Sequence, residues 1–160
     1  KHSTGGVGDK VTLILIPIIA ALNLPVAKVS SRGLGITGGT IDKLEAIPGF
    51  DTQMNLEEFK DNIKKVGASI INQNFNIAPA EKKMYKLRNE VACNDSIPLI
   101  AASLLSLKIA TGSNKIAFDI TCGKGTYLKS KEEAKRLEKI YNEWKIKCEE
   151  RRALWEEEEE

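Results

Sequence analysis

The longest apolar run of the chain lies near its beginning and predicts a helix. Residues 11–22 are almost all aliphatic and too many in succession for a buried strand, so we expect a buried helix that Pro17 can bend. Val26–Ser30 is short and β-branched and precedes a glycine cluster, which is typical of a buried strand that ends in a loop. Residues 68–72 and 115–121 predict two further strands.

Helical patterns lie between and after these strands. A helix is expected to begin at Thr40 and run to Ala46, and Asn55 can cap another over residues 56–66. From Pro79 the apolar positions take helical spacing, with one stripe formed by Met84, Leu87 and Val91. The region from Pro79 onward is therefore predicted to be a helical insert.

Two more helices are predicted in the second half of the chain. Ser96 is placed to cap one that has Pro98 in its first turn. Glycines at 123 and 125 turn the chain toward a final helix, which carries an amphipathic stripe of Leu137, Tyr141, Trp144 and Cys148. Strands alternating with helices predict the α/β class, here a partial, mainly parallel sheet with flanking helices.

Composition narrows the class of protein further. With 160 residues, 42% hydrophobic and 29% charged, the chain fits one globular domain. No apolar run reaches the roughly 18 residues that a bilayer requires, and the glycine-rich start is unlike a signal peptide, so we expect a cytoplasmic protein with no membrane partner. Cys93, Cys122 and Cys148 are odd in number and widely spaced, which argues against a zinc site or a disulfide framework.

The charge pattern favours an anionic ligand. Net charge is +2, and without the five glutamates at 156–160 the rest of the chain is more strongly basic. The glutamates themselves are typical of a solvated or interacting tail. Aromatic residues make up only 6% of the chain and the lysines are scattered, so the stacking surface of a nucleic-acid-binding protein is not indicated.

Two glycine-rich loops are the candidate binding elements. In residues 1–9, glycines let backbone N–H groups approach an anion, the following helix adds positive potential, and Lys1, Ser3 and Thr12 can supply charge and hydroxyl donors. The plainer interpretation is a flexible glycine-rich terminus. No Walker lysine follows, so this is not an ordinary P-loop.

The second loop follows the strand over Val26–Ser30. It contains a GxGxxG pattern at Gly33, Gly35 and Gly38, which also occurs in dinucleotide-binding folds, but no acidic residue is clearly placed to hold a ribose. Two hydroxyl-rich glycine loops in one small domain suggest that they approach two sides of one anion.

Several motifs together resemble the thymidine and pyrimidine nucleoside phosphorylases. They are Lys-His-Ser-Thr-Gly-Gly-Val-Gly-Asp at 1–9, Arg-Gly-Leu-Gly-x-Thr-Gly-Gly-Thr-x-Asp-Lys-Leu-Glu at 32–45, and Ala-Pro-Ala-x-Lys-Lys-x-Tyr-x-Leu-Arg at 78–88. Ser-Ile-Pro-Leu-Ile from Ser96 extends the match, which covers about residues 1–140 in the order and spacing of the family. The resemblance implies phosphorolysis of thymidine or uridine to a free base and a pentose 1-phosphate.

The resemblance also implies a role for each site residue. Orthophosphate, the co-substrate, would contact Lys1, Ser3, Thr12, Lys28, Ser30 and Thr40. The pyrimidine would face Tyr85, Arg88 and Ser103, with His2 as the acid near the base carbonyl and Arg88 stabilising the charge of the leaving base. No metal and no organic cofactor is expected. The family's place in nucleoside salvage and its homodimers, formed through a helical domain, become expectations for this chain.

The same resemblance divides the chain into segments. Residues 1–78 are expected to form the first part of the α/β phosphate-binding domain, 79–112 a two-helix segment belonging to the helical domain, 113–155 the return to the α/β domain with the final helix, and 156–160 an acidic tail. Family members are much longer, so we expect a fragment, a degraded gene product or one piece of a split enzyme. The two-helix segment is then expected to expose an apolar face.

Some positions depart from the family pattern. Leu107 stands where a base-binding lysine is expected one turn after Ser103, and Lys108 follows one residue too late, rotated by about 100° around the helix. Residues 121–127 also differ from the usual third motif. Two alternatives therefore stay open: a catalytically impaired fragment that retains phosphate binding, and a related phosphoribosyltransferase, which would need acidic metal ligands that are not evident.

Overall fold

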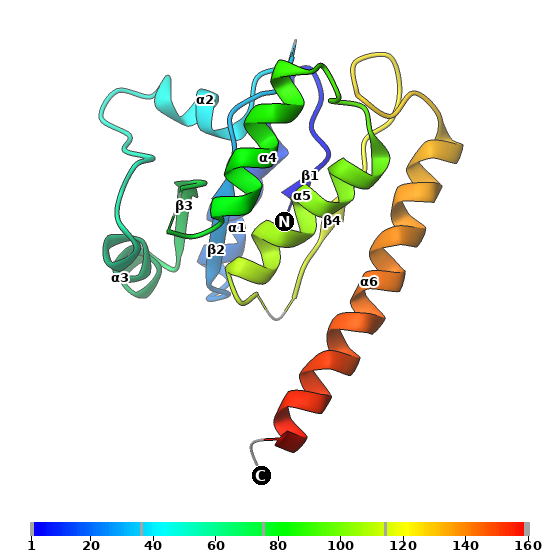
Figure 1. The fold of residues 1–160 in the computed structure, drawn as a ribbon. Coiled ribbons are helices and arrows are strands. Elements are labelled where there is room, and N and C mark those ends of the chain that lie inside the picture. The colour runs from blue at the N-terminus through cyan, green and yellow to red at the C-terminus, as the bar shows by residue number, and fades with distance from the viewer. Residues whose placement is uncertain (1, 36, 75, 114, 159–160) are drawn as a thin grey trace.

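The computed structural model describes residues 2–35, 37–74, 76–113 and 115–158, with side chains from Ser3 to Trp144 within those ranges. Helices and strands follow one another as the sequence pattern indicates (Figure 1). The elements in chain order are β1 (His2–Ser3), α1 (Val11–Ala21), β2 (Val26–Ser30), α2 (Thr40–Glu45), α3 (Leu56–Val66), β3 (Ala68–Asn72), α4 (Pro79–Glu90), α5 (Ile97–Ala110), β4 (Phe118–Asp119) and α6 (Lys131–Glu158).

The strands form two parallel pairs, which confirms the α/β class. β2 pairs with β3 along its whole length, from Val26 opposite Ala68 to Ser30 opposite Asn72, and β1 pairs separately with β4. The strand expected over 115–121 is therefore much shorter than predicted. Its partner β1 supplies only two residues, and beyond them the backbone N–H of Thr121 donates to the Thr4 side chain, Oγ1, instead of to a strand.

A predicted helix start carries a capping hydrogen bond only where both a donor and an acceptor are present. Asn55 Oδ1 accepts from the backbone N–H groups of Glu57 and Glu58, and Glu58 Oε2 accepts from the N–H of Asn55, so α3 begins with a full capping box. Ser96 occupies the predicted start of α5, but its side chain makes no capping hydrogen bond. Pro98, in the first turn of the helix, has no N–H that could donate to the serine. The predicted start of the helix is therefore confirmed, but the predicted capping hydrogen bond is not formed.

Apolar side chains cover both faces of the β2–β3 pair. Successive strand residues point to opposite faces, which places Ile70 on one side and Ile71 on the other. The first face packs against α1 and α2 through Ile16, Val26, Ile41, Leu44 and Ile70. The second packs against α3 and α5 through Val29, Phe59, Ile71, Ala78 and Leu107.

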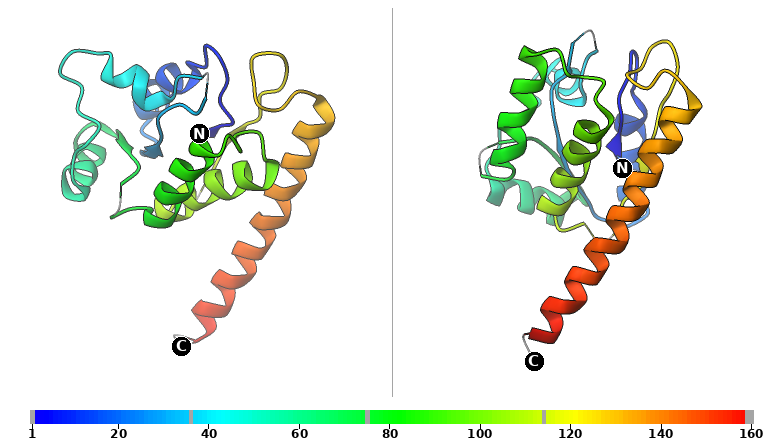
Figure 2. Two further views of the ribbon diagram at one scale, coloured as in Figure 1. Left: turned by 45° about the horizontal axis from the view of Figure 1, so that its top comes forward. Right: turned by 45° about the vertical axis from the view of Figure 1, so that its right-hand side comes forward.

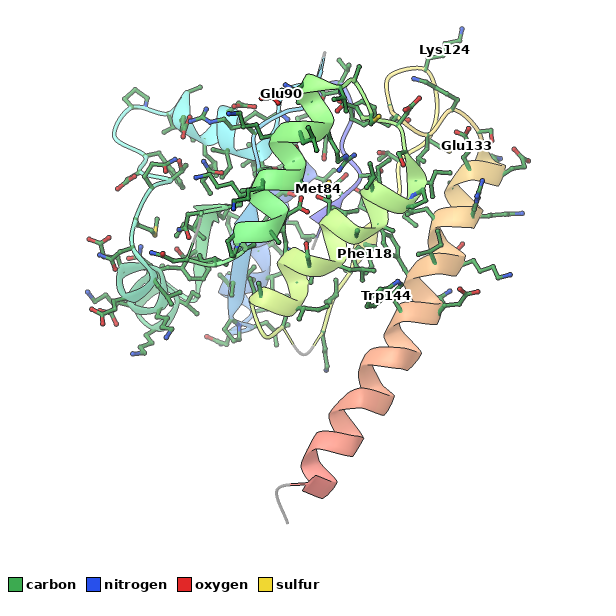
Figure 3. The ribbon with its side chains drawn as sticks, viewed as in Figure 1. Met84, Glu90, Phe118, Lys124, Glu133 and Trp144 are labelled. Atoms are coloured by element: carbon green, nitrogen blue, oxygen red, sulfur yellow. The ribbon has the colours of Figure 1, made fainter. Side chains whose placement is uncertain are left out.

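A third cluster joins α5 to α6. Leu137 and Tyr141 of the predicted stripe are buried there, and the Tyr141 ring stacks on Phe118 with 4.1 Å between ring centroids. Trp144 is 46% exposed, and the side chain of Cys148 lies outside the described residues (Figure 3). α6 continues to Glu158, beyond the end of the final helix expected at 155. Its C-terminal half extends away from the other elements in every view (Figure 2).

The two-helix segment between β3 and β4 presents an apolar stripe at its surface. Met84, Leu87 and Val91 are exposed by 44%, 50% and 56%, and Met84 is labelled in Figure 3. Among the helices that the structure describes, none is long and apolar enough to cross a membrane.

Candidate functional site

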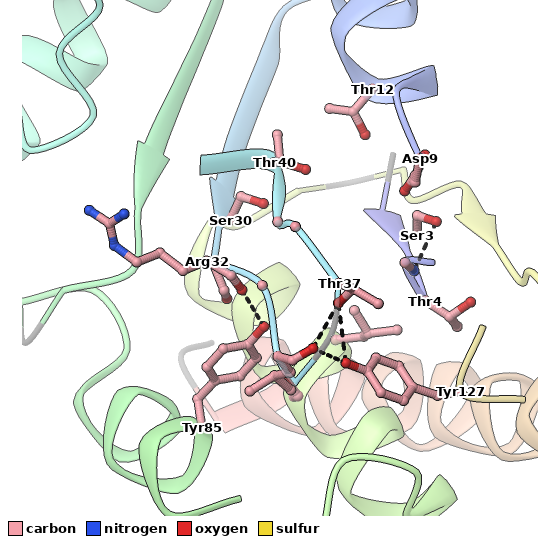
Figure 4. Close-up of a pocket in the computed structure, with 18 of the residues that line it drawn as sticks. Ser3, Thr4, Asp9, Thr12, Ser30, Arg32, Thr37, Thr40, Tyr85 and Tyr127 are labelled. Carbon is pink, nitrogen blue, oxygen red and sulfur yellow. Dashed lines mark hydrogen bonds between the residues drawn. The ribbon is translucent and has the colours of Figure 1, made fainter. Parts of the chain in front are cut away.

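One polar cavity gathers the predicted site residues that the structure describes. Its volume is about 100 Å³, several times the 10–15 Å³ that one water molecule needs. It is lined by the ends of β1 and β2, both glycine loops, and the inner faces of α4 and α5 (Figure 4). The predicted residues in its wall are Ser3, Thr12, Lys28, Ser30, Thr40, Tyr85, Arg88 and Ser103. Lys1 and the side chain of His2 lie outside the described residues.

Hydroxyl groups and a buried cation occupy the part of the cavity next to the strands. Ser30 and Lys28 are carried by β2, Thr12 by the first turn of α1 and Thr40 by the first turn of α2 (Figure 4). Lys28 is only 2% exposed. Shielding from water strengthens the attraction of an ammonium group for an anion, so this part of the cavity is chemically suited to a small oxyanion.

The second glycine loop is folded around one carboxylate, Asp42. Its Oδ2 accepts from the backbone N–H groups of Gly33 at 2.7 Å and Gly39 at 2.8 Å. Burial alone would raise the pKa of Asp42, but these two hydrogen bonds and the nearby Arg32 outweigh it and hold that pKa below its usual value. Two glycine N–H groups that the sequence pattern left available for a ligand are therefore used to shape the loop.

The same loop is clamped by tyrosines from two other segments. Tyr85 of α4 donates from its hydroxyl to the backbone carbonyl of Arg32 at 2.6 Å. On the other side, the Tyr127 hydroxyl donates to the carbonyl of Leu34 and lies 3.1 Å from Thr37 Oγ1 (Figure 4). Tyr85 was predicted to face a base, and its hydroxyl is instead occupied by the loop, which leaves its ring as the group that faces the cavity.

The first glycine loop is fastened to residues 119–125, far away in sequence. Thr4 N–H donates to the carbonyl of Asp119 at 3.0 Å, and the hydroxyls of Thr4 and Thr121 are 2.9 Å apart. Thr121 Oγ1 donates to the carbonyl of Gly5 at 2.5 Å. The segment whose motif departs from the family pattern thus supports the loop that carries Ser3. No local sequence signal marks this pairing.

Arg88 is buried and largely engaged by the backbone. Its Nε, Nη1 and Nη2 donate to the carbonyls of Cys93, Leu99 and Asn94 at 3.4, 3.3 and 3.1 Å. Burial lowers its pKa, although Glu81 and nearby groups act in the opposite direction. The guanidinium ties the end of α4 to the start of α5, and it also contributes to the cavity wall.

Leu107 and Lys108 both lie outside the cavity wall and are both buried. Leu107 is fully enclosed in the apolar cluster behind the β2–β3 pair, and Lys108 is 4% exposed. Desolvation lowers the pKa of Lys108 to about 8. Lys108 therefore does not replace the base donor expected at position 107.

The fold and the cavity together define an α/β domain that surrounds a polar, cation-bearing site. A sequence model of the family described as "Glycosyl transferase family, a/b domain" matches residues 1–155, and the chain belongs to that family.

Curated relatives of similar sequence are nucleoside phosphorylases by name. The chain is 51% identical to a pyrimidine-nucleoside phosphorylase of Bacillus subtilis (strain 168) over 139 residues, which is 87% of this chain and 32% of the relative. It is 50% identical to a thymidine phosphorylase of Agrobacterium fabrum over 137 residues, 86% of this chain and 31% of the relative. The chain thus spans about a third of the length of the curated relatives that it matches.

Proposed function

We propose that this chain carries the phosphate- and base-binding part of a pyrimidine nucleoside phosphorylase. The observation that supports it is the convergence of eight predicted site residues, from six segments of the chain, on one cavity. Similarity to relatives named pyrimidine-nucleoside and thymidine phosphorylase supports the choice of substrates, orthophosphate with thymidine or uridine. The proposed reaction yields the free base and a pentose 1-phosphate.

In the proposed reaction an oxygen of orthophosphate attacks the anomeric carbon while the bond from that carbon to the base nitrogen breaks. The bonding electrons leave with the base, so negative charge moves from phosphate toward the pyrimidine. Lys28, Ser30 and Thr40 would hold the phosphate, Arg88 would stabilise the developing base anion, and Ser103 would contact the base. His2 is proposed to return a proton to the base as a general acid. The scheme uses no metal and no organic cofactor.

The same proposal extends to segments, assembly and location. Residues 1–78 and 113–155 would belong to an α/β domain and 79–112 to a helical one, and the exposed stripe of α4 would be covered in a homodimer. Nucleoside salvage in the cytoplasm is the role that fits a phosphorylase of this kind.

A second candidate is a chain that binds phosphate but recognises the base poorly. Two observations favour it: Leu107 is buried away from the cavity, and three N–H groups of Arg88 are bound to backbone carbonyls. The phosphoribosyltransferase alternative has less support, because Asp9 is the single carboxylate among the described residues that line the cavity.

Release of free base distinguishes the two candidates. The chain is incubated with uridine or thymidine, with and without inorganic phosphate, and uracil or thymine is quantified by chromatography. Phosphorylase activity predicts base release that depends on phosphate and produces an equal amount of pentose 1-phosphate. Phosphate-independent release, or no release from a chain that still binds phosphate, would contradict the first candidate.

A further inference from the structure

A buried carboxylate lies directly behind the base end of the cavity. Glu81, in the first turn of α4, is 7% exposed, and its Oε1 accepts a 2.5 Å hydrogen bond from the hydroxyl of Ser103 on α5. Ser103 is itself 5% exposed and lines the cavity, whereas Glu81 does not. Burial raises the pKa of Glu81, while the hydrogen bond from Ser103 and the charge of Arg88 act to lower it. The ionised carboxylate can only accept, so the single hydroxyl hydrogen of Ser103 is directed away from the cavity and toward Glu81.

This contact fixes whether the Ser103 hydroxyl donates or accepts hydrogen bonds on its cavity side. A serine hydroxyl has one hydrogen to donate and two lone pairs that accept, and it normally rotates to suit its partner. With its hydrogen held by Glu81, the oxygen of Ser103 offers only lone pairs to a ligand in the cavity. The apolar residues Ile100 and Leu104 also line the cavity, and Ser103 is buried, so a mismatched polar pair at this wall is costly.

Arg88, in contrast, can only donate hydrogen bonds to a ligand. A guanidinium has five N–H donors and no acceptor, and the three backbone carbonyls account for three of those donors. The remaining N–H groups can only donate to a ligand. The wall of the cavity therefore combines an acceptor on α5 with a donor on α4.

We propose that Glu81 is a specificity-determining residue, which orients the Ser103 hydroxyl so that the site accepts bases with an imide N–H beside a carbonyl and rejects cytosine. Uracil and thymine present an N–H donor next to a carbonyl acceptor, which complements Ser103 and Arg88. Cytosine presents a ring-nitrogen acceptor next to an amino donor, the reverse order. The inference rests on the proposed function, since it assumes that a pyrimidine occupies this end of the cavity.

The test compares the affinities of free uracil and free cytosine, measured by NMR titration of the chain in the presence of phosphate. Wild type is expected to bind uracil at least tenfold more tightly than cytosine, the effect of one mispaired buried polar group. Glu81→Gln keeps the size of the side chain, but its amide can donate to Ser103 as well as accept, so the uracil-to-cytosine ratio should fall severalfold. Glu81→Leu should reduce the ratio further, through tighter cytosine binding.

Controls separate orientation from general damage to the fold. Glu90→Gln, at an exposed position on the same helix, should leave the ratio unchanged. In a Ser103→Ala background, Glu81→Gln should have no further effect on the ratio, because the hydroxyl that it orients is gone. A purely structural role of Glu81 would weaken both bases equally.

The possible failures are distinguishable. If wild type binds uracil and Glu81→Gln keeps the wild-type ratio, or lowers both affinities alike, the role of Glu81 is overturned and the proposed function stands. If wild type binds neither base, the proposed function fails and this inference fails with it.

Discussion

Replacing Gly39 with alanine is expected to weaken phosphate binding by roughly 100-fold. A Cβ at Gly39 would lie 2.4 Å from the backbone carbon of Arg32 and 2.4 Å from the backbone nitrogen of Gly33, far inside contact distance. Neither atom belongs to a flexible side chain, so the loop would have to open and release the hydrogen bond from Gly39 N–H to Asp42. Displacement of site groups by about 1 Å costs roughly 100-fold in activity, and the crowding itself costs about 1–3 kcal/mol of stability.

The preceding residue provides a matched control. A Cβ at Gly38 would have no atom within 4 Å, and Gly38 is not among the glycines with positive φ. Gly38→Ala should therefore retain phosphate binding and stability, and the two variants can be compared by calorimetric titration with phosphate and by urea unfolding. Equal phosphate affinities in Gly38→Ala and Gly39→Ala would show that the close backbone contact of Gly39 with Arg32 and Gly33 is not required for the site.

Replacing Arg88 with leucine is expected to cost about 3 kcal/mol or more of unfolding free energy. The substitution removes three partly buried hydrogen bonds from a charged group to the backbone carbonyls of residues 93, 94 and 99, and a hydrogen bond of that kind contributes about 1.5–3 kcal/mol. Urea unfolding monitored by circular dichroism measures this loss. The connection between α4 and α5 should loosen, which would also displace Ser103 from the cavity wall.

Lys86→Leu is the control for Arg88→Leu. Lys86 lies on the same helix and forms an exposed ion pair with Glu90, with its side chain 81% exposed, so its loss should change stability by no more than about 0.5 kcal/mol. If Arg88→Leu costs no more than Lys86→Leu, the guanidinium does not hold the two helices together, and its hydrogen bonds to the backbone carry no net stability.

Local patterns in the sequence were sufficient to predict most elements, whereas the residues of the cavity wall were implied by the family resemblance. A β-branched run before glycines placed Lys28 and Ser30 at the end of β2, and helical spacing after Pro79 placed Tyr85 and Arg88 on one helix. These features depend on residues close together in the chain, where spacing fixes geometry. Local spacing alone therefore assigns the motifs to strands, loops and helices.

The contacts that shape the cavity do not follow from local patterns. Thr4 and Thr121 are 117 positions apart, and nothing in either segment indicates that they meet. Asp42 resembles an ordinary acidic residue in the first turn of a helix, and Glu81 a solvated one, yet each is the acceptor for groups of another segment. The strand over 115–121 was overestimated because strand length depends on a partner, and β1 has only two residues.

The central claim is that the buried cation and hydroxyls of the cavity hold orthophosphate, and titration with inorganic phosphate tests it most directly. Isothermal calorimetry on wild type, Lys28→Met and Lys10→Met compares a buried lysine of the cavity wall with an exposed lysine near the first loop, at equal change of net charge. We predict one phosphate per chain, with affinity at least tenfold weaker in Lys28→Met and unchanged in Lys10→Met. No phosphate binding by wild type, or equal affinities in wild type and Lys28→Met, would contradict the claim.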